Sequence, residues 1–367
     1  RRAHAAWRRS ALAQRIADHA AMESAARQAI EWARRAGDAE RRLLSQRMLA
    51  MSLAFQGRLA EGRGVAQQTL DEARSLGVHQ VEGSCLNALG VLAAMEHDEV
   101  GALAFDQQSL VAYKANGDRR NEAIAHGNIG AGWLGLGELT GARRELEQCL
   151  RLMRSNGERA LEVSPLCALS SLALWQGDDA HALVQANAAL ETAVAVHARD
   201  QEVAALCRVG EAELALGRHA PAMQSFASAL ARATEIASPY RDDAAAGMAR
   251  VALAQGDTWA AMQALEPLLA AGAAATGDDN PFQGAEFPRL IEWTCYRVLA
   301  SAVDGDSRAA EWLARAHQAL QAQAATIADT ELRRGFLNHI PCHREILAAW
   351  ATQDTTRAYS VKAKPSK

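Results

Sequence analysis

The stretch "LGLGELTGA", residues 134–142, decides the fold, because its glycines suit either a phosphate-binding loop or a turn between two helices. A phosphate-binding loop follows a β-strand, opens onto the N-terminus of a helix and commonly ends in GK[ST]. No strand pattern precedes residue 134, and GK[ST] occurs nowhere in the chain. We therefore interpret Gly137 as the end of a helix and "ELTGA" as the start of the next one.

Gly137 is one member of a periodic series. A second series of glycines lies midway between its members, and the segments between the two are about 16 to 19 residues long with apolar residues at i, i+3, i+4 and i+7. Each unit therefore reads as helix A, a turn, helix B and a second turn. The first series is Gly57, His97, Gly137, Gly177, Gly217 and Gly256, spaced by 40, 40, 40, 40 and 39 residues; the second is Gly37, Gly77, Gly117, Gly157 and Gly277, with His197 and Ala237 at the positions where glycine is missing.

The registered repeats resemble the tetratricopeptide repeat (TPR) in a form with long helices, over about residues 2 to 322. Asp106 and Ala186 depart from the large apolar residue that the family places in helix B. The resemblance implies an all-α fold, a right-handed superhelical α-solenoid of about eight helix-turn-helix repeats. The small residues of helix A are Gly90, Gly130, Ser170, Gly210 and Ala249, the alanines of helix B are Ala102, Ala142, Ala182, Ala222 and Ala261, and the large apolar residues are Leu146, Phe226 and Leu265.

The period breaks down after residue 275. We expect a connecting loop over 276–289, a divergent last helix pair with a capping segment over 290–350, and a disordered tail over 351–367. Pro267 is expected to kink or shorten its helix. The segment "ELRRGFLNHIPCHREILAAW", residues 331–350, resembles the closing segment found after repeats in large bacterial signalling proteins that join an ATPase core to an effector. The seven repeats before the loop are expected at 2–37, 38–77, 78–117, 118–157, 158–197, 198–237 and 238–275.

Composition narrows the class of protein. A net charge of −4 gives no electrostatic reason for binding nucleic acid, and no apolar run is long enough for a membrane span. The six cysteines form no CxxC pair, which favours reduced thiols in a cytoplasmic protein. Because the chain begins without methionine and already in a helical pattern, we expect it to be a fragment of a longer bacterial protein.

The sequence contains no pattern of catalytic residues. His339, Cys342 and His343 could suggest a metal site, but Pro341 breaks their helical spacing and no fourth ligand lies nearby. Asp278 and Asp279 with Asn280 could suggest a calcium site, but the spacing and terminal glutamate of an EF-hand are missing. We therefore predict no catalytic residue, no cofactor and no metal, and a protein that is not an enzyme.

Function is expected in the groove that the resemblance places along the inner faces of the A helices. The lysine–asparagine clamp that binds C-terminal carboxylates in this family is absent, since no A helix carries lysine. Phe55, Met95 and Trp175 could instead simply pack between adjacent A helices. The predicted groove residues are Arg47, Met51, Phe55, Asn87, Met95, Asn128, Ser171, Trp175, Arg208, Glu211, Asp243 and Arg250.

Two functions remain open at this point. The first is a non-catalytic scaffold that binds a protein or ligand in the concave groove and regulates other domains of the same bacterial signalling protein. The alternative is a stand-alone TPR adaptor or peptide-binding receptor. An ATPase motif encoded upstream would favour the first, and a start codon just before Arg1 the second.

Overall fold

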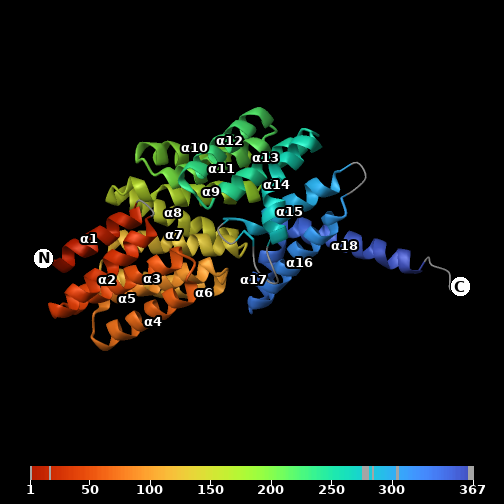
Figure 1. Cartoon of the computed structure of the whole chain (residues 1–367). Coiled ribbons are helices and arrows are strands. Elements are labelled where there is room, and N and C mark those ends of the chain that lie inside the picture. Colours follow the sequence, from red (N-terminus) through yellow and green to blue (C-terminus); the bar gives the residue numbers. More distant parts are fainter. Residues whose placement is uncertain (1, 16–17, 275–280, 283–284, 303–305, 363–367) are drawn as a thin grey trace. The chain divides into compact units, whose positions relative to one another are not determined.

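The structure, a computed structural model, describes residues 2–15, 18–274, 281–282, 285–302 and 306–362. Within these ranges the chain is built of α-helices and one 3-10 turn and contains no strand (Figure 1). Consecutive helices pack against one another as hairpins. The expected all-α solenoid of TPR-like repeats is therefore the observed fold. The A helices are α1 (Arg2–Arg15), α3 (Ala39–Phe55), α5 (His79–Met95), α7 (Arg119–Gly135), α9 (Val163–Trp175), α11 (Arg199–Ala215), α13 (Arg241–Ala254) and α15 (Pro288–Ala300); the B helices are α2 (His19–Arg35), α4 (Leu59–Ser75), α6 (Glu99–Ala115), α8 (Leu139–Asn156), α10 (Asp179–Ala195), α12 (His219–Ile236), α14 (Thr258–Ala274) and α16 (Arg308–Thr326); α17 (Thr330–Asn338) and α18 (Pro341–Lys362) follow, and η1 (Arg159–Leu161) precedes α9.

The turns owe their shape to left-handed residues at the forty-residue positions. Gly37, Gly57 and Gly137 have φ of +67°, +79° and +71°, a region that glycine enters without the steric cost of a Cβ. His197 and Ala237, which interrupt the glycine series in the sequence, adopt the same conformation, with φ of +55° and +52°. The turn geometry is thus kept even where the residue type is unfavourable for it.

Aspartates begin several of the helices. The side chains of Asp38, Asp98 and Asp178 each accept a hydrogen bond from the backbone N–H three residues later, which satisfies one of the free donors at a helix N-terminus. The acidic residues that follow the turns in the sequence therefore act as helix caps at these positions.

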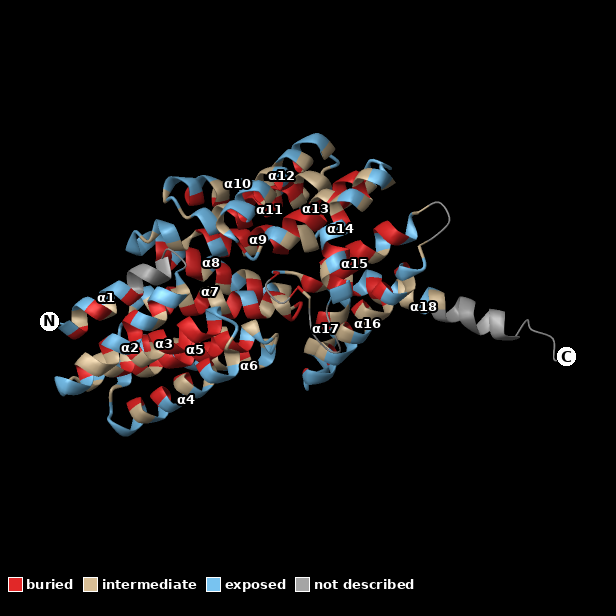
Figure 2. Cartoon of the chain, viewed as in Figure 1, coloured by how far each residue is buried: buried red, intermediate tan, exposed pale blue. Residues whose placement is uncertain are grey.

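The small residues of the A helices allow helices A and B to approach closely. A Cβ added to Gly210 would lie 2.8 Å from the ring of Phe226, and one added to Gly90 would lie 2.6 Å from a carboxylate oxygen of Asp106. Figure 2 shows that the buried residues concentrate on the faces where helices meet. Burial of these faces between neighbouring hairpins supplies the apolar contacts that a single hairpin lacks.

Inter-residue contacts divide the chain into two compact units, which are described separately below. Unit 1 comprises residues 1–132 and 147–156, and unit 2 comprises residues 133–146 and 157–367. This division does not coincide with the limit at residue 275 that the repeat pattern suggested. In both units the A helices pack against one another: α3 on α5 in unit 1, and α9 on α11, α11 on α13 and α13 on α15 in unit 2.

Two helices beyond the last repeat, α17 and α18, cover the end of the repeat array. Helices α17 and α18 pack with α15 and α16, and Glu345 accepts a hydrogen bond of 2.6 Å from the indole of Trp293. The ring of His339 also makes a hydrogen bond of 2.9 Å with the carbonyl oxygen of Gly137, 202 residues earlier in the chain. The segment at 331–350 therefore covers the last helix pair and also touches the turn after α7.

Two local expectations meet a different structure. Pro267 lies inside α14, which continues to Ala274, so the proline does not end that helix. Helix α18 runs past Trp350 to Lys362, so the described backbone is helical over most of the segment expected to be a disordered tail. The expected loop at 276–289 lies mostly outside the described residues, and α15 begins at Pro288, slightly before its expected start.

Candidate functional site

In unit 1 the predicted groove contains a run of polar residues on consecutive A helices. Arg47 lies on α3, Asn87 on α5 and Asn128 on α7. Their spacing is close to the repeat length, and α3 packs directly on α5. The repeat thus places one polar side chain per hairpin along one side of the unit. We call Arg47, Asn87 and Asn128 the unit 1 polar row.

Among the described residues, Arg47 has no acidic partner. It pairs with no carboxylate among the described residues, its Nε is buried without a hydrogen-bond partner, and Nη2 lies 2.9 Å from the sulfur of Met48. Burial lowers the pKa of the Arg47 guanidinium below its usual value. A cation removed from water without a counter-charge is costly, so a carboxylate that reached it would gain a strong charge-assisted hydrogen bond.

The asparagines of the row are connected to a buried acid, Asp106 on α6. The Asn128 Nδ2 donates to Asp106 Oδ1 at 3.3 Å. The Asn87 amide also lies near enough to Asp106 to favour the charged carboxylate, but its buried Nδ2 makes no hydrogen bond of good geometry among the described residues. Burial raises the pKa of the Asp106 carboxyl group to about 7, although the Asn128 and Asn87 amides favour its charged form. Asp106 was not among the predicted site residues. The sequence did mark it as unusual, because it is an acid at the helix B position where other repeats have a large apolar residue.

The apolar residues predicted for unit 1 are divided between core and surface. Met51 is buried, and Met95 packs against the core formed by α3, α4 and α5. Phe55 is 36% exposed and lies with its ring centroid 5.0 Å from that of His19. Met51 and Met95 therefore belong mainly to helix packing, and Phe55 is the one of these three that presents an apolar surface.

In unit 2 the predicted groove residues converge on two residues that the sequence did not single out, Glu286 and Phe287. Arg208 on α11 is buried, and its Nη1 donates to the hydroxyl oxygen of Ser171 on α9 at 3.1 Å. Its Nη2 lies 3.6 Å from Glu286 Oε2, and its guanidinium carbon lies 4.9 Å from the centre of the Phe287 ring. Burial alone would lower the pKa of Arg208, but Glu286 and Glu211 outweigh it and raise the pKa.

The same two residues are held by α13 and by the end of α9. Asp243 accepts hydrogen bonds from the backbone N–H groups of Glu286 at 3.1 Å and Phe287 at 3.3 Å. Burial and the charge of Glu286 raise the pKa of Asp243 to about 7. The Trp175 ring meets the Phe287 ring edge-on, with centroids 6.1 Å apart. No repeat signal marks Glu286 or Phe287, because they lie in the insertion after the seventh repeat.

Glu211 and Arg250, the remaining predicted residues, form a buried pair. Arg250 donates to both carboxylate oxygens of Glu211, with 2.6 Å between Nη1 and Oε2. Burial opposes ionisation of Glu211, but Arg250 outweighs it and lowers the pKa of the carboxyl group. The guanidinium carbon of Arg250 also lies 5.8 Å from the centre of the Phe226 ring. These two charges neutralise each other and connect α11 to α13.

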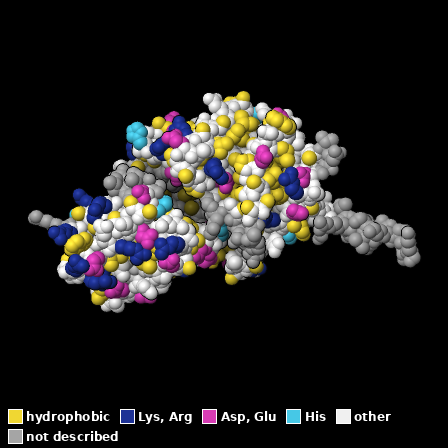
Figure 3. All heavy atoms as spheres, viewed as in Figure 1, with side chains coloured by type: hydrophobic (Ala, Val, Ile, Leu, Met, Phe, Trp, Pro, Cys, Tyr) yellow, Lys and Arg dark blue, Asp and Glu magenta, His cyan; other side chains and the backbone are white. Residues whose placement is uncertain are grey.

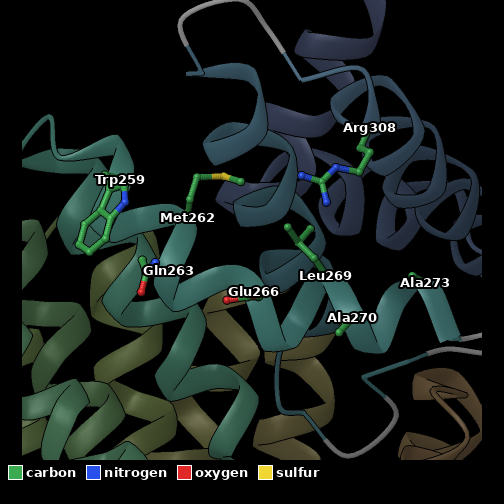
Figure 4. Close-up of a pocket in the computed structure, with 8 residues that line it drawn as sticks. All are labelled: Trp259, Met262, Gln263, Glu266, Leu269, Ala270, Ala273 and Arg308. Atoms are coloured by element: carbon green, nitrogen blue, oxygen red, sulfur yellow. The ribbon is translucent and has the colours of Figure 1, made fainter.

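A separate pocket lies on helix B of the seventh hairpin (Figure 4). It has a volume of about 410 Å³ and is formed by α14 together with Arg308 at the start of α16. Trp259 is 72% exposed, and Figure 3 shows hydrophobic side chains gathered over the α13–α14 region of the visible face. None of the predicted groove residues lines this pocket. Its lining is Trp259, Met262, Gln263, Glu266, Leu269, Ala270, Ala273 and Arg308.

The histidines and cysteines considered for chemistry serve the fold. His339 contacts the Gly137 carbonyl group, and His343 makes a hydrogen bond of 2.8 Å with the carbonyl oxygen of Phe336. Burial raises the pKa of the Cys85 and Cys167 thiols to about 12, which leaves them protonated near neutral pH. Over the described part of the chain, no group of three or more His, Cys, Asp or Glu side chains is placed to hold a metal ion.

None of the helices in the described ranges combines the length and apolar character that crossing a bilayer demands.

Comparison with known proteins supports the fold. No family model matches the sequence. The regulatory protein AfsR of Streptomyces griseus is 24% identical over 245 residues, which cover 59% of this chain and 25% of AfsR. The match therefore spans about a quarter of that curated relative.

Three solved structures are similar over most of this chain. A Rap protein complexed with Competence and Sporulation Factor has a TM-score of 0.66 at 14% identity, covering 96% of this chain and 99% of that one. NprR in complex with its cognate peptide NprX has a TM-score of 0.58 at 13% identity, covering 96% and 100%. A signal transduction ATPase with a tetratricopeptide repeat sensor, PH0952 from Pyrococcus horikoshii, has a TM-score of 0.55 at 12% identity, covering 92% and 54%. At these identities the likeness establishes a TPR-like helical solenoid.

Proposed function

We propose that this chain is a non-catalytic sensor that binds a peptide or an extended protein segment along the inner faces of its A helices. The unit 1 polar row carries the proposal, because among the described residues Arg47 has no counter-charge and the buried Asn87 amide, although near Asp106, makes no hydrogen bond of good geometry. A peptide would supply what both lack: a carboxylate for Arg47 and backbone carbonyl oxygens for the asparagine amides. The complexes named for the similar structures, Rap with Competence and Sporulation Factor and NprR with its cognate peptide NprX, are consistent with this assignment.

The test is selection of ligands from a library of random peptides displayed on phage, followed by fluorescence anisotropy with the selected peptides. We expect peptides with an acidic residue to be enriched. Arg47→Met should weaken binding by about 10-fold or more, since a hydrogen bond to a charged group contributes roughly 1.5–3 kcal/mol. Asn87→Ala should weaken it by about 2- to 10-fold, since a neutral hydrogen bond contributes roughly 0.5–1.5 kcal/mol. Arg34→Met, which changes an arginine on α2 with a 70% exposed side chain, is the matched control. Unchanged affinity in both row variants would refute the assignment of the site.

We assign the sensor to a larger bacterial regulatory protein, because the match to AfsR covers only a quarter of that protein and the similar region of PH0952 is about half of that chain. The likeness to Rap and NprR over nearly their whole length favours the second candidate, a stand-alone peptide receptor. Sequencing the reading frame upstream of Arg1 separates them. A P-loop motif in frame supports the larger protein, and a start codon immediately upstream supports the receptor.

A further inference from the structure

We infer that the A-helix faces of α9, α11 and α13 form a second peptide-binding site, specific for an acidic residue followed by an aromatic one, and that the chain's own Glu286 and Phe287 fill it until a partner segment displaces them. We call the site, formed by Ser171, Trp175, Arg208 and Asp243, the unit 2 site. The inference rests on the proposed function and adds to it a ligand class and a mode of regulation.

The unit 2 site recognises backbone and side chains by separate groups, as a peptide site does. Asp243 accepts from two consecutive backbone N–H groups, at 3.1 and 3.3 Å, and such contacts are available from any extended peptide. Arg208 lies 3.6 Å from the carboxylate of Glu286, which selects an acidic side chain. Backbone binding and side-chain selection thus come from different helices, α13 and α11.

The aromatic side chain is selected by two further contacts. The Phe287 ring lies against the Arg208 guanidinium, 4.9 Å from its carbon, and meets the Trp175 ring edge-on at 6.1 Å. A cation over one ring and an edge-to-face neighbour both favour an aromatic residue over an aliphatic one of similar size. Ser171 accepts from Arg208 and so orients the guanidinium between the two side chains that it contacts.

The two internal residues are held loosely compared with their neighbours in sequence. The side chain of Glu286 is 30% exposed and Phe287 is only half-buried, whereas Phe282 and Pro288 are buried. Phe282 packs on Trp312, with ring centroids 6.1 Å apart, in contact with a different helix. The carbonyl oxygen of Phe287 also accepts from the backbone N–H groups of Leu290 and Ile291, so Phe287 begins α15. The side chains of Glu286 and Phe287 can leave the unit 2 site without loss of the Phe282 contact, and their departure would be felt at the first turn of α15.

The two units differ in a way that supports displacement. Arg208 in unit 2 has an acidic partner from the chain itself, whereas Arg47 in unit 1 has none among the described residues. A segment that competes for Arg208 must also supply a carboxylate. The internal Glu286 therefore lowers the apparent affinity of every peptide, and peptides without an acidic residue at this position cannot displace it. Binding at the unit 2 site then releases residues 286 and 287, which precede α15 directly.

The direct test uses a fluorescein-labelled peptide with the sequence of residues 281–290, PFQGAEFPRL, and the whole chain. Glu286→Ala/Phe287→Ala removes the internal acidic and aromatic side chains and leaves only the two backbone hydrogen bonds to Asp243. This variant should bind the peptide at least about 10-fold more tightly than the wild type, because no internal side chain competes for Arg208 and Trp175. Adding Arg208→Met should remove that gain. The peptide PFQGAKAPRL, in which the acidic and aromatic residues are replaced, is the control and should not bind. Equal affinity of wild type and double variant would overturn the inference.

A second measurement needs no substitution and decides the matter if the double variant does not fold. Hydrogen exchange of the wild-type chain is followed with and without excess peptide PFQGAEFPRL. The amides of Glu286 and Phe287 should exchange faster when the peptide displaces them from Asp243, while those of α4 remain unchanged. No change in exchange at these two amides under saturating peptide would overturn the inference. Arg47-dependent binding of library peptides would still support the proposed function in that case, so the two failures are distinguishable.

Discussion

Replacing Asp106 by asparagine should remove a pH-dependent loss of stability from the repeat array. Asp106 is 5% exposed, and burial raises the pKa of its carboxyl group from 3.8 to about 7, against the opposing influence of the Asn128 and Asn87 amides. The protonated form is therefore favoured in the folded state. As pH rises from about 4 to about 7, the unfolded chain loses this proton first, and the folded state becomes less stable relative to it.

The size of the effect follows from the shift. A change of about 3 pH units, at 1.36 kcal/mol each, corresponds to about 4 kcal/mol in the free energy of unfolding, all of it lost by about pH 8. The amide introduced by Asp106→Asn would not titrate, and its carbonyl oxygen could still accept from the Asn128 Nδ2. We therefore expect this variant to match the wild type near pH 4 and to exceed it by several kcal/mol near pH 8.

The assay is urea unfolding followed by circular dichroism at several pH values between about 4 and 8. Asp71→Asn, on the exposed surface of α4, is the control and should leave the profile unchanged. Other groups titrate in this range in both proteins, so the difference between variant and wild type isolates Asp106. A difference that stays constant within about 0.5 kcal/mol over the whole range would refute the reasoning.

Three further substitutions test the packing. Gly210→Ala should lower the free energy of unfolding by about 1–3 kcal/mol, because its Cβ would lie 2.8 Å from the buried Phe226 ring. Gly64→Ala, on an open helix surface, should raise it by about 0.5–1 kcal/mol. Thermal melting compares the two variants, and equal effects would contradict the close approach of α11 and α12 at Gly210. Ala237→Gly should raise the free energy of unfolding by about 0.5 kcal/mol. Glycine removes the steric strain of a Cβ at a φ of +52°, and this gain exceeds the cost of its greater freedom in the unfolded chain. A lower melting temperature than that of the wild type would contradict this prediction. Arg250→Met should lower the free energy of unfolding in urea by about 3–5 kcal/mol, because it leaves Glu211 buried without its partner. Arg34→Met, at an exposed ion pair, should lower it by less than about 1 kcal/mol. A similar small loss in both variants would show that the buried pair contributes little to stability.

The helical framework could be predicted because it depends on local signals. Left-handed turn residues, aspartate caps and small residues at crossings recur every forty residues, and each acts through neighbours close in sequence. The candidate site was predictable only in part. The repeat register located Arg47, Asn87 and Arg208, but whether each has a partner depends on residues from other elements, such as Asp106 on α6 and Glu286 in the insertion. Those partners follow no period, so no repeat pattern could locate them.

The turn at Gly137 separates what the sequence predicts from what only the tertiary structure determines. The sequence by itself determined that "LGLGELTGA" joins two helices, because a missing strand, a missing GK[ST] and a forty-residue period leave no other reading. Only the folded chain shows a second reason for the glycine: a Cβ at Gly137 would lie 2.5 Å from the carbonyl oxygen of Gly335, and His339 contacts the Gly137 carbonyl group. Gly137 and the residues it meets are about 200 positions apart in the sequence, and they come together because the last helices pack against the turn after α7. A local sequence pattern cannot predict such a contact.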